Sequence, residues 1–180
     1  FHLSYLSTKK SAEKVKKAKA KGLNITADVA LNNLFLTDEA VNNFDTRYKV
    51  MPPLRTAKDN KALIKALKDG TIDVISTDHS PQDEEHKKIE FDNAADGIIG
   101  LESAFGLLGK HLLPHLELSQ LIEKIAINPR KILGIKSATL TEGNTANITL
   151  FNPDLEWKFK VIDIKSKSVN TPFIGELLKG

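Results

Sequence analysis

Two hydrophobic periodicities alternate along the first two thirds of the chain. Short runs of alternating or β-branched residues predict strands over residues 1–6, 23–29 and 72–76. Apolar residues at helical spacing predict helices over residues 9–21, 57–68, 99–110 and 118–126. Strands and helices that follow one another in this way indicate a parallel sheet with right-handed crossovers.

Polar and glycine residues mark the ends of these segments. Ser7 or Thr8 is placed to cap the helix over 9–21, and Gly22 ends it. Thr56 begins the helix over 57–68 in a pattern close to a capping box. A further helix is predicted to start at Thr37, and the prolines of segment 51–55 predict an extended loop.

The pattern changes after about residue 137. Residues 145–151 and 156–161 predict strands that are joined by a turn at 152–154. We therefore expect two parts, residues 1–136 and residues 137–180. Three strand–helix steps cannot close an eightfold barrel, so the first part is either an open sheet or the last portion of a longer barrel. The chain begins at Phe1 inside a predicted strand, and we expect it to be a fragment of a longer protein.

The composition is that of an ordinary globular protein and narrows the possible functions. Of the 180 residues, 41% are hydrophobic and 27% are charged. No apolar run reaches the about 18 residues of a membrane span, and a net charge of +3 does not indicate nucleic-acid binding. The chain has no cysteine, which excludes disulfides and thiolate metal sites and is compatible with a cytoplasmic location.

Asp78 is the strongest candidate for chemistry, because it follows the predicted strand 72–76 at the place where α/β folds usually carry their sites. Metal binding or proton transfer is one interpretation, and a helix cap or salt-bridged carboxylate is the other. His79 and His86 fit no recognised set of metal ligands, which favours a solvated loop. The lysines of segment 9–21 similarly favour a solvated helix face over a phosphate site.

Seven short segments match one family in order and spacing. They are Ser7-Thr8-Lys9, Pro52-Pro53-Leu54-Arg55, Asp69-Gly70-Thr71-Ile72-Asp73, Thr77-Asp78-His79-Ser80-Pro81, Gly97-Ile98-Ile99-Gly100-Leu101-Glu102, the segment 128–134 and the segment 166–175. Together they resemble dihydroorotase of the multifunctional-complex type, a branch of the amidohydrolase superfamily. The resemblance implies strands six to eight of a (β/α)8 TIM barrel of amidohydrolase type and part of a small flanking β-sandwich.

The resemblance also implies a chemistry. Such enzymes interconvert carbamoyl-aspartate and dihydroorotate, and zinc acidifies the water that attacks the ring amide. Asp78 matches the aspartate that binds metal and moves the proton in this family. Ala95 and Gly97 match the region whose backbone binds the pyrimidine ring.

At several positions this chain carries a residue that differs from the one typical of the family. Tyr5 replaces a histidine ligand, and a phenol with a pKa of about 10 is a poor zinc ligand at neutral pH. Met51 replaces the asparagine that binds substrate, and Gln82 replaces the second histidine of an Asp-His-Ala-Pro-His motif. Segment 31–33 replaces Pro-His-His. We therefore expect the zinc site to be absent or incomplete, and this chain alone to be inactive.

Three hypotheses remain for the whole protein. In the first, it is a degenerate dihydroorotase-like protein that serves as a structural partner, for example of aspartate carbamoyltransferase, or that self-associates. In the second, it is an active zinc dihydroorotase with a small-molecule substrate. In the third and weaker hypothesis, it is a related cyclic-amide hydrolase of the hydantoinase kind, because Met51 suits a less polar ring.

Overall fold

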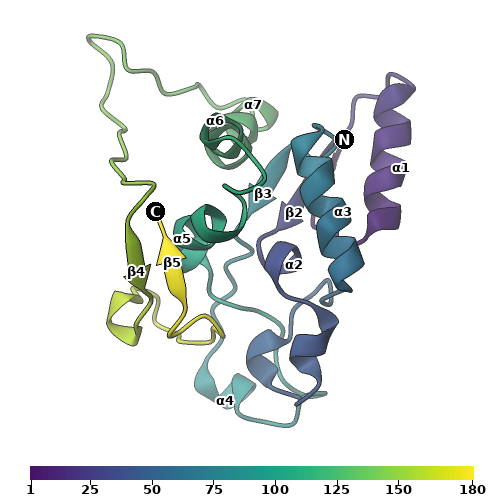
Figure 1. The fold of residues 1–180 in the computed structure, drawn as a ribbon, viewed down its shortest axis with the longest axis vertical. Coiled ribbons are helices and arrows are strands. Elements are labelled where there is room, and N and C mark those ends of the chain that lie inside the picture. The colour runs from purple at the N-terminus through teal and green to yellow at the C-terminus, as the bar shows by residue number, and fades with distance from the viewer.

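A three-stranded parallel sheet carries the first half of the molecule. The computed structural model describes all residues from Phe1 to Gly180. The strands are β1 (His2–Leu3), β2 (Thr26–Ala30) and β3 (Val74–Ser76), in the order β1-β2-β3. Helices α1 (Lys9–Ala20) and α3 (Ala57–Lys68) connect them and lie side by side on one face of the sheet (Figure 1). The predicted parallel arrangement is therefore confirmed, although each strand is shorter than its pattern suggested.

Helix α1 begins and ends where the sequence predicts. The Thr8 hydroxyl accepts a hydrogen bond from the Ser11 backbone N–H at 3.1 Å, which satisfies a donor of the first turn. Ala12 and Val15 face the core. Gly22 adopts a φ of 76°, a left-handed conformation in which the helix cannot continue.

Helix α3 also has its predicted bounds. The Thr56 side chain accepts from the Asp59 N–H, and Thr56 donates to the Asp59 carboxylate at 2.6 Å. Leu63, Ala66 and Leu67 are buried against the sheet and its neighbours, as their spacing requires. These contacts join the helix to the hydrophobic core, which contains 24 buried residues.

Short helices fill the loops at the carboxyl ends of β2 and β3. Helix α2 (Asn32–Phe35) and the 3-10 turns Asp38–Val41 and Thr46–Tyr48 follow β2. The helix predicted to start at Thr37 is therefore a single 3-10 turn. The loop after β3 contains α4 (Glu84–Lys87), which the sequence did not predict. In Figure 1, α2 lies just below β2, and α4 lies at the lower end of the molecule.

The remaining helices follow as α5 (Leu101–His111), α6 (Leu118–Ile122) and α7 (Asn128–Ile132), with a π-helical segment Glu123–Ile127 between α6 and α7. Gly134, at a φ of 67°, lies two residues beyond the end of α7. No helix in the structure combines the length and the apolar character that crossing a membrane requires.

The C-terminal part contains one small antiparallel sheet, formed by β4 (Glu156–Lys158) and β5 (Leu177–Lys179). The strand predicted over 145–151 is wrong: the segment has no strand partner, and Ile148 and Leu150 are 65% and 97% exposed. Its alternating pattern indicates a strand, but a strand forms only where a neighbour accepts its hydrogen bonds. The predicted strand 156–161 ends at Lys158, and β5 was not predicted.

Candidate functional site

Two side chains from different strand ends meet at the carboxyl edge of the sheet. Tyr5 lies two residues beyond β1, and Asp78 lies two residues beyond β3. Both adopt left-handed backbone conformations, with φ of 59° and 50°, which are uncommon for residues other than glycine. The structure therefore brings together the two positions that the sequence singled out, and it does so through strained backbone of the kind that often marks functional sites.

The electrostatics of this pair favour uncharged side chains. Burial raises the pKa of Asp78, the nearby Asp28 carboxylate raises it further, and the Tyr5 hydroxyl, acting as a hydrogen-bond donor, opposes the shift. The pKa of the Tyr5 phenol is also raised, first by burial and then by the Asp78 and Asp28 carboxylates. The phenol therefore stays protonated at neutral pH and acts toward Asp78 as a donor.

Asp28, in the middle of β2, forms hydrogen bonds with residues in or next to both neighbouring strands. Its carboxylate accepts from the Tyr5 backbone N–H at 2.9 Å and from the Ser76 hydroxyl at 3.2 Å. The His2 Nε2 atom lies 2.9 Å from the same carboxylate, and His2 Nδ1 lies 2.8 Å from the Thr26 hydroxyl. Asp28 was not predicted as a site residue, although it is the one carboxylate in the strand Thr26–Ala30.

The donor atoms at this edge do not fit a zinc site. Zinc in proteins takes neutral imidazole nitrogens, thiolates and carboxylates. Both ring nitrogens of His2 already have hydrogen-bonding partners, and Tyr5 offers a neutral phenol in place of an imidazole. The chain contains no group of three or more His, Cys, Asp or Glu side chains arranged to hold a metal ion.

The backbone at Ala95 and Gly97 is fully engaged in internal hydrogen bonds. The Ala95 N–H donates to His86 O at 2.9 Å, and the Gly97 N–H donates to Lys49 O at 2.9 Å. The Lys87 ammonium donates to Ala95 O at 2.8 Å and to Gly97 O at 3.3 Å. Each of these four backbone groups therefore has a hydrogen-bond partner within the chain.

Gly97 also has a steric reason to be glycine. Its φ is 134°, and a Cβ atom built there would lie 2.6 Å from the Ser80 Cβ. The Asn170 amide donates to both Ser80 O and Gly97 O at 3.0 Å, which holds the two loops together. Close packing between loops therefore accounts for this glycine.

Met51 and Gln82 occupy separate surroundings. The Met51 side chain is 62% exposed. The Gln82 amide donates to Asp96 O at 3.0 Å, and its backbone N–H donates to the Asn170 side chain at 3.1 Å, so Gln82 braces the same loops. In segment 31–33, Asn32 is fully buried and neither of its amide atoms has a hydrogen-bond partner.

His79 caps helix α5. Its Nδ1 atom accepts from the backbone N–H groups of Gly100 and Leu101 at 3.1 and 3.3 Å, and its Nε2 lies 3.2 Å from the Ser166 hydroxyl. Gly100, the residue before the helix, provides no side-chain cap of its own. His79 is therefore a structural acceptor and not a solvated loop residue, whereas His86 pairs with the exposed Asp83 carboxylate at 2.6 Å.

Comparison with known proteins identifies the family. The model of the amidohydrolase family matches residues 1–177. The chain belongs to the amidohydrolase family. It is 48% identical to a dihydroorotase of Thermoanaerobacter sp. (strain X514) and 44% identical to a dihydroorotase of Acetivibrio thermocellus, over 181 aligned residues in each case. These alignments cover 99% of the chain but only 42% of each relative.

Solved structures of other proteins share the fold. A D-hydantoinase from Thermus sp. superimposes with a TM-score of 0.90 at 23% identity, over 99% of this chain and 41% of its own. The inactive dihydroorotase-like domain of a CAD-like multifunctional protein from Chaetomium thermophilum gives 0.67 at 24% identity, over 99% and 47%. The prediction of an amidohydrolase α/β fold is confirmed, and the chain corresponds to part of such a fold.

Proposed function

We propose that the protein containing this chain is a dihydroorotase-like protein of pyrimidine biosynthesis, of the multifunctional-complex type, in which the zinc site is degenerate. It acts in the cytoplasm as a structural partner, for example of aspartate carbamoyltransferase. The relatives named dihydroorotase support this branch of the family, because they are 48% and 44% identical over nearly the whole chain.

The observation that carries the proposal is the pairing of Tyr5 with Asp78. In the family pattern, a histidine and this aspartate both serve a metal. Here a neutral phenol donates toward the carboxylate, and burial keeps the pKa of Asp78 raised. A hydrogen-bond donor thus takes the place that a cation would occupy as the partner of Asp78.

The loop at Ala95 and Gly97 supports the same proposal. Lys87 and Asn170 occupy the carbonyl oxygens that would otherwise be available to a pyrimidine ring. The solved dihydroorotase-like domain that shares this fold is described as inactive, which gives the proposal a precedent on the same scaffold. In this proposal, the fold is kept without catalytic activity because a partner protein binds it.

Zinc content and turnover of the full-length protein test the proposal. We expect zinc well below one equivalent per chain after purification without chelators, and no closure of carbamoyl-aspartate above background. An Asp78→Asn variant is the matched control and should leave both measurements unchanged. Zinc at one or more equivalents per chain, together with ring closure that Asp78→Asn abolishes, would establish the alternative of an active zinc dihydroorotase.

The partner role needs its own measurement. We expect the full-length protein to comigrate with aspartate carbamoyltransferase from the same organism in size-exclusion chromatography with light-scattering detection. Separate elution at micromolar concentrations of both proteins would exclude that enzyme as the partner. A self-associated form would instead be seen as a mass above one chain in the absence of the enzyme.

A further inference from the structure

A polar cavity lies between helix α4 and the tail segment 167–170. Its volume is about 420 Å³, and four of its lining side chains are cationic while two are carboxylates. Neither Tyr5 nor Asp78 lines it. The cavity is therefore distinct from the pair formed by Tyr5 and Asp78.

Lys87 is the unusual residue of this cavity. It is only 6% exposed, and its ammonium donates to the carbonyl oxygens of Ala95 and Gly97. Its ammonium has three protons to donate, the chain provides two carbonyl acceptors for them, and no carboxylate forms an ion pair with it. Burial lowers the pKa of Lys87, and the nearby Lys49 ammonium also lowers it, whereas the Asp96 and Asp45 carboxylates raise it.

The other charges of the cavity are mostly neutralised. Arg47 pairs with Asp45 at 2.6 Å, and Lys88 pairs with the lining residue Glu84. The second lining carboxylate, Asp83, is bound to His86.

Unlike Arg47 and Lys88, Lys167 has no carboxylate partner. It is exposed, and its side chain makes no ion pair or hydrogen bond. The cavity thus holds two cations without carboxylate partners, one buried and one at the rim.

We propose that this cavity binds a small oxyanion, a phosphate or a carboxylate group, held by Lys87 and Lys167 with the Ser168 hydroxyl as a further donor. Charge-assisted hydrogen bonds to an oxyanion are among the stronger polar contacts in proteins, and a bound anion gives buried Lys87 the direct ion pair that it does not form within the chain. Because Lys87 also holds the carbonyls of Ala95 and Gly97, an occupied cavity fixes that loop against the tail.

Thermal unfolding of the full-length protein with added anions tests the inference. Inorganic phosphate and succinate are titrated separately, and sodium chloride keeps the ionic strength constant. We expect a saturable rise in Tm with at least one of the two anions. A saturable response to phosphate alone, or to succinate alone, identifies the chemical class of the ligand. A rise that sodium chloride alone reproduces, or no rise with either anion, would overturn the proposal.

Two variants locate the effect. Lys167→Gln should weaken the apparent affinity about tenfold, as expected for loss of one charged contact. Lys14→Gln, which removes an exposed lysine of α1, is the matched control and should respond like the unchanged protein. Equal responses from both variants would show that the anion binds elsewhere. Ser168→Ala provides a second test that does not disturb the buried Lys87.

Discussion

At the scale of single residues, the decisive feature is Asp78, whose carboxylate is partly buried and whose backbone is strained. Asp78 has a left-handed backbone and a raised pKa, with burial as the largest cause. Asparagine tolerates this backbone conformation better than most residues and carries no charge. The position is therefore costly to keep as aspartate unless something compensates the charge, and in this chain the Tyr5 hydroxyl does so in part.

Asp78→Asn should stabilise the chain at neutral pH. Because the pKa of Asp78 is raised in the folded state, its contribution to stability is fully present below its ordinary pKa of 3.8 and is lost as the pH rises through the folded value. Removing the charge should raise Tm by about 2 °C at pH 7, allowing for solvent screening, with little effect near pH 4. Calorimetry at both pH values measures this.

The exposed Asp92 gives the control for that measurement. Asp92→Asn should change Tm little and equally at both pH values. A loss of stability in Asp78→Asn at pH 7 would mean that the carboxylate makes a favourable interaction that outweighs its burial.

Residue patterns located part of this site in advance. Asp78 was predictable because it follows the β-branched strand 72–76, and Tyr5 was singled out by the family resemblance; the structure places them together. The satisfied backbone at Ala95 and Gly97 was not predictable, because Lys87 comes from a helix that no periodicity indicated. A four-residue helix is too short to show a helical period, so only the folded loop reveals what its side chains contact.

At the scale of elements, the close contact of α5 with β5 joins the two parts of the chain. Gly106 and Gly109 face the strand, and Leu178 of β5 is fully buried against the helix. A Cβ atom at Gly109 would lie 1.9 Å from Lys179 O, so the strand backbone can approach only because the side chain is absent. Figure 1 shows β5 alongside α5.

Gly109→Ala should therefore destabilise the protein. In an isolated helix the same change is favourable by about 1 kcal/mol, but here the strand must move, at a cost of about 1–3 kcal/mol. Urea unfolding of the variant measures the difference. Lys14→Ala, an exposed position of α1, serves as the control and should stay within about 0.5 kcal/mol. A more stable Gly109→Ala protein would show that β5 does not pack so closely.

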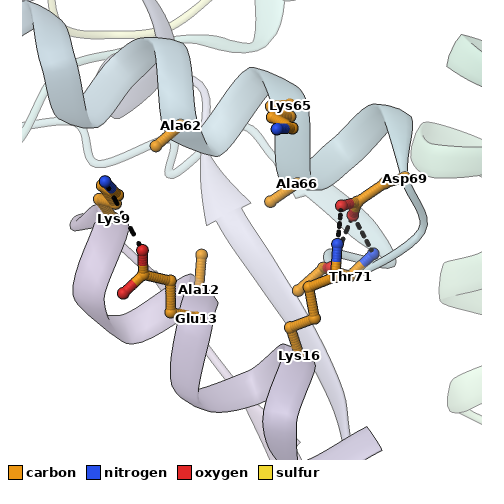
Figure 2. A pocket seen from close by; sticks show the side chains of 9 residues that line it. All are labelled: Lys9, Ala12, Glu13, Lys16, Ala62, Lys65, Ala66, Asp69 and Thr71. Atoms are coloured by element: carbon orange, nitrogen blue, oxygen red, sulfur yellow. Dashed lines mark hydrogen bonds and ion pairs between the residues drawn. The ribbon is translucent and has the colours of Figure 1, made fainter. Parts of the chain in front are cut away.

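Helices α1 and α3 pack closely without glycine. Figure 2 shows the groove between them, with Ala12, Ala62 and Ala66 as its floor. Ion pairs cross or border it, including Lys16 with Asp69 at 2.5 Å. Small side chains let these helices approach, and the lysines remain largely in solvent, as the sequence pattern favoured.

At the scale of the whole molecule, the sheet has open edges. β1 pairs only with β2, β3 pairs only with β2, and Leu3 of β1 is 42% exposed. Unpaired strand edges with apolar side chains favour association with other chains. The first hydrophobic side chain, Phe1, is 98% exposed beside this edge.

The 180-residue chain by itself should therefore self-associate and lack dihydroorotase activity. Sedimentation velocity should show species heavier than one chain, and Leu3→Lys should shift the distribution toward the monomer. Leu23→Lys adds the same charge at a residue that is 55% exposed but lies outside the strands, and it should have the smaller effect. A monomeric unchanged chain would show that the open edge is tolerated.

The sequence by itself determined helices α1 and α3, their N-terminal caps and the parallel order of the sheet. These depend on residues close together in the chain, such as Thr8 with Ser11. Tertiary structure alone decided the pairing of β5 with β4, the absence of a strand over 145–151, the role of His79 as a cap and the burial of Lys87. Each of these requires a partner distant in sequence, and local periodicity carries no information about which distant groups will meet.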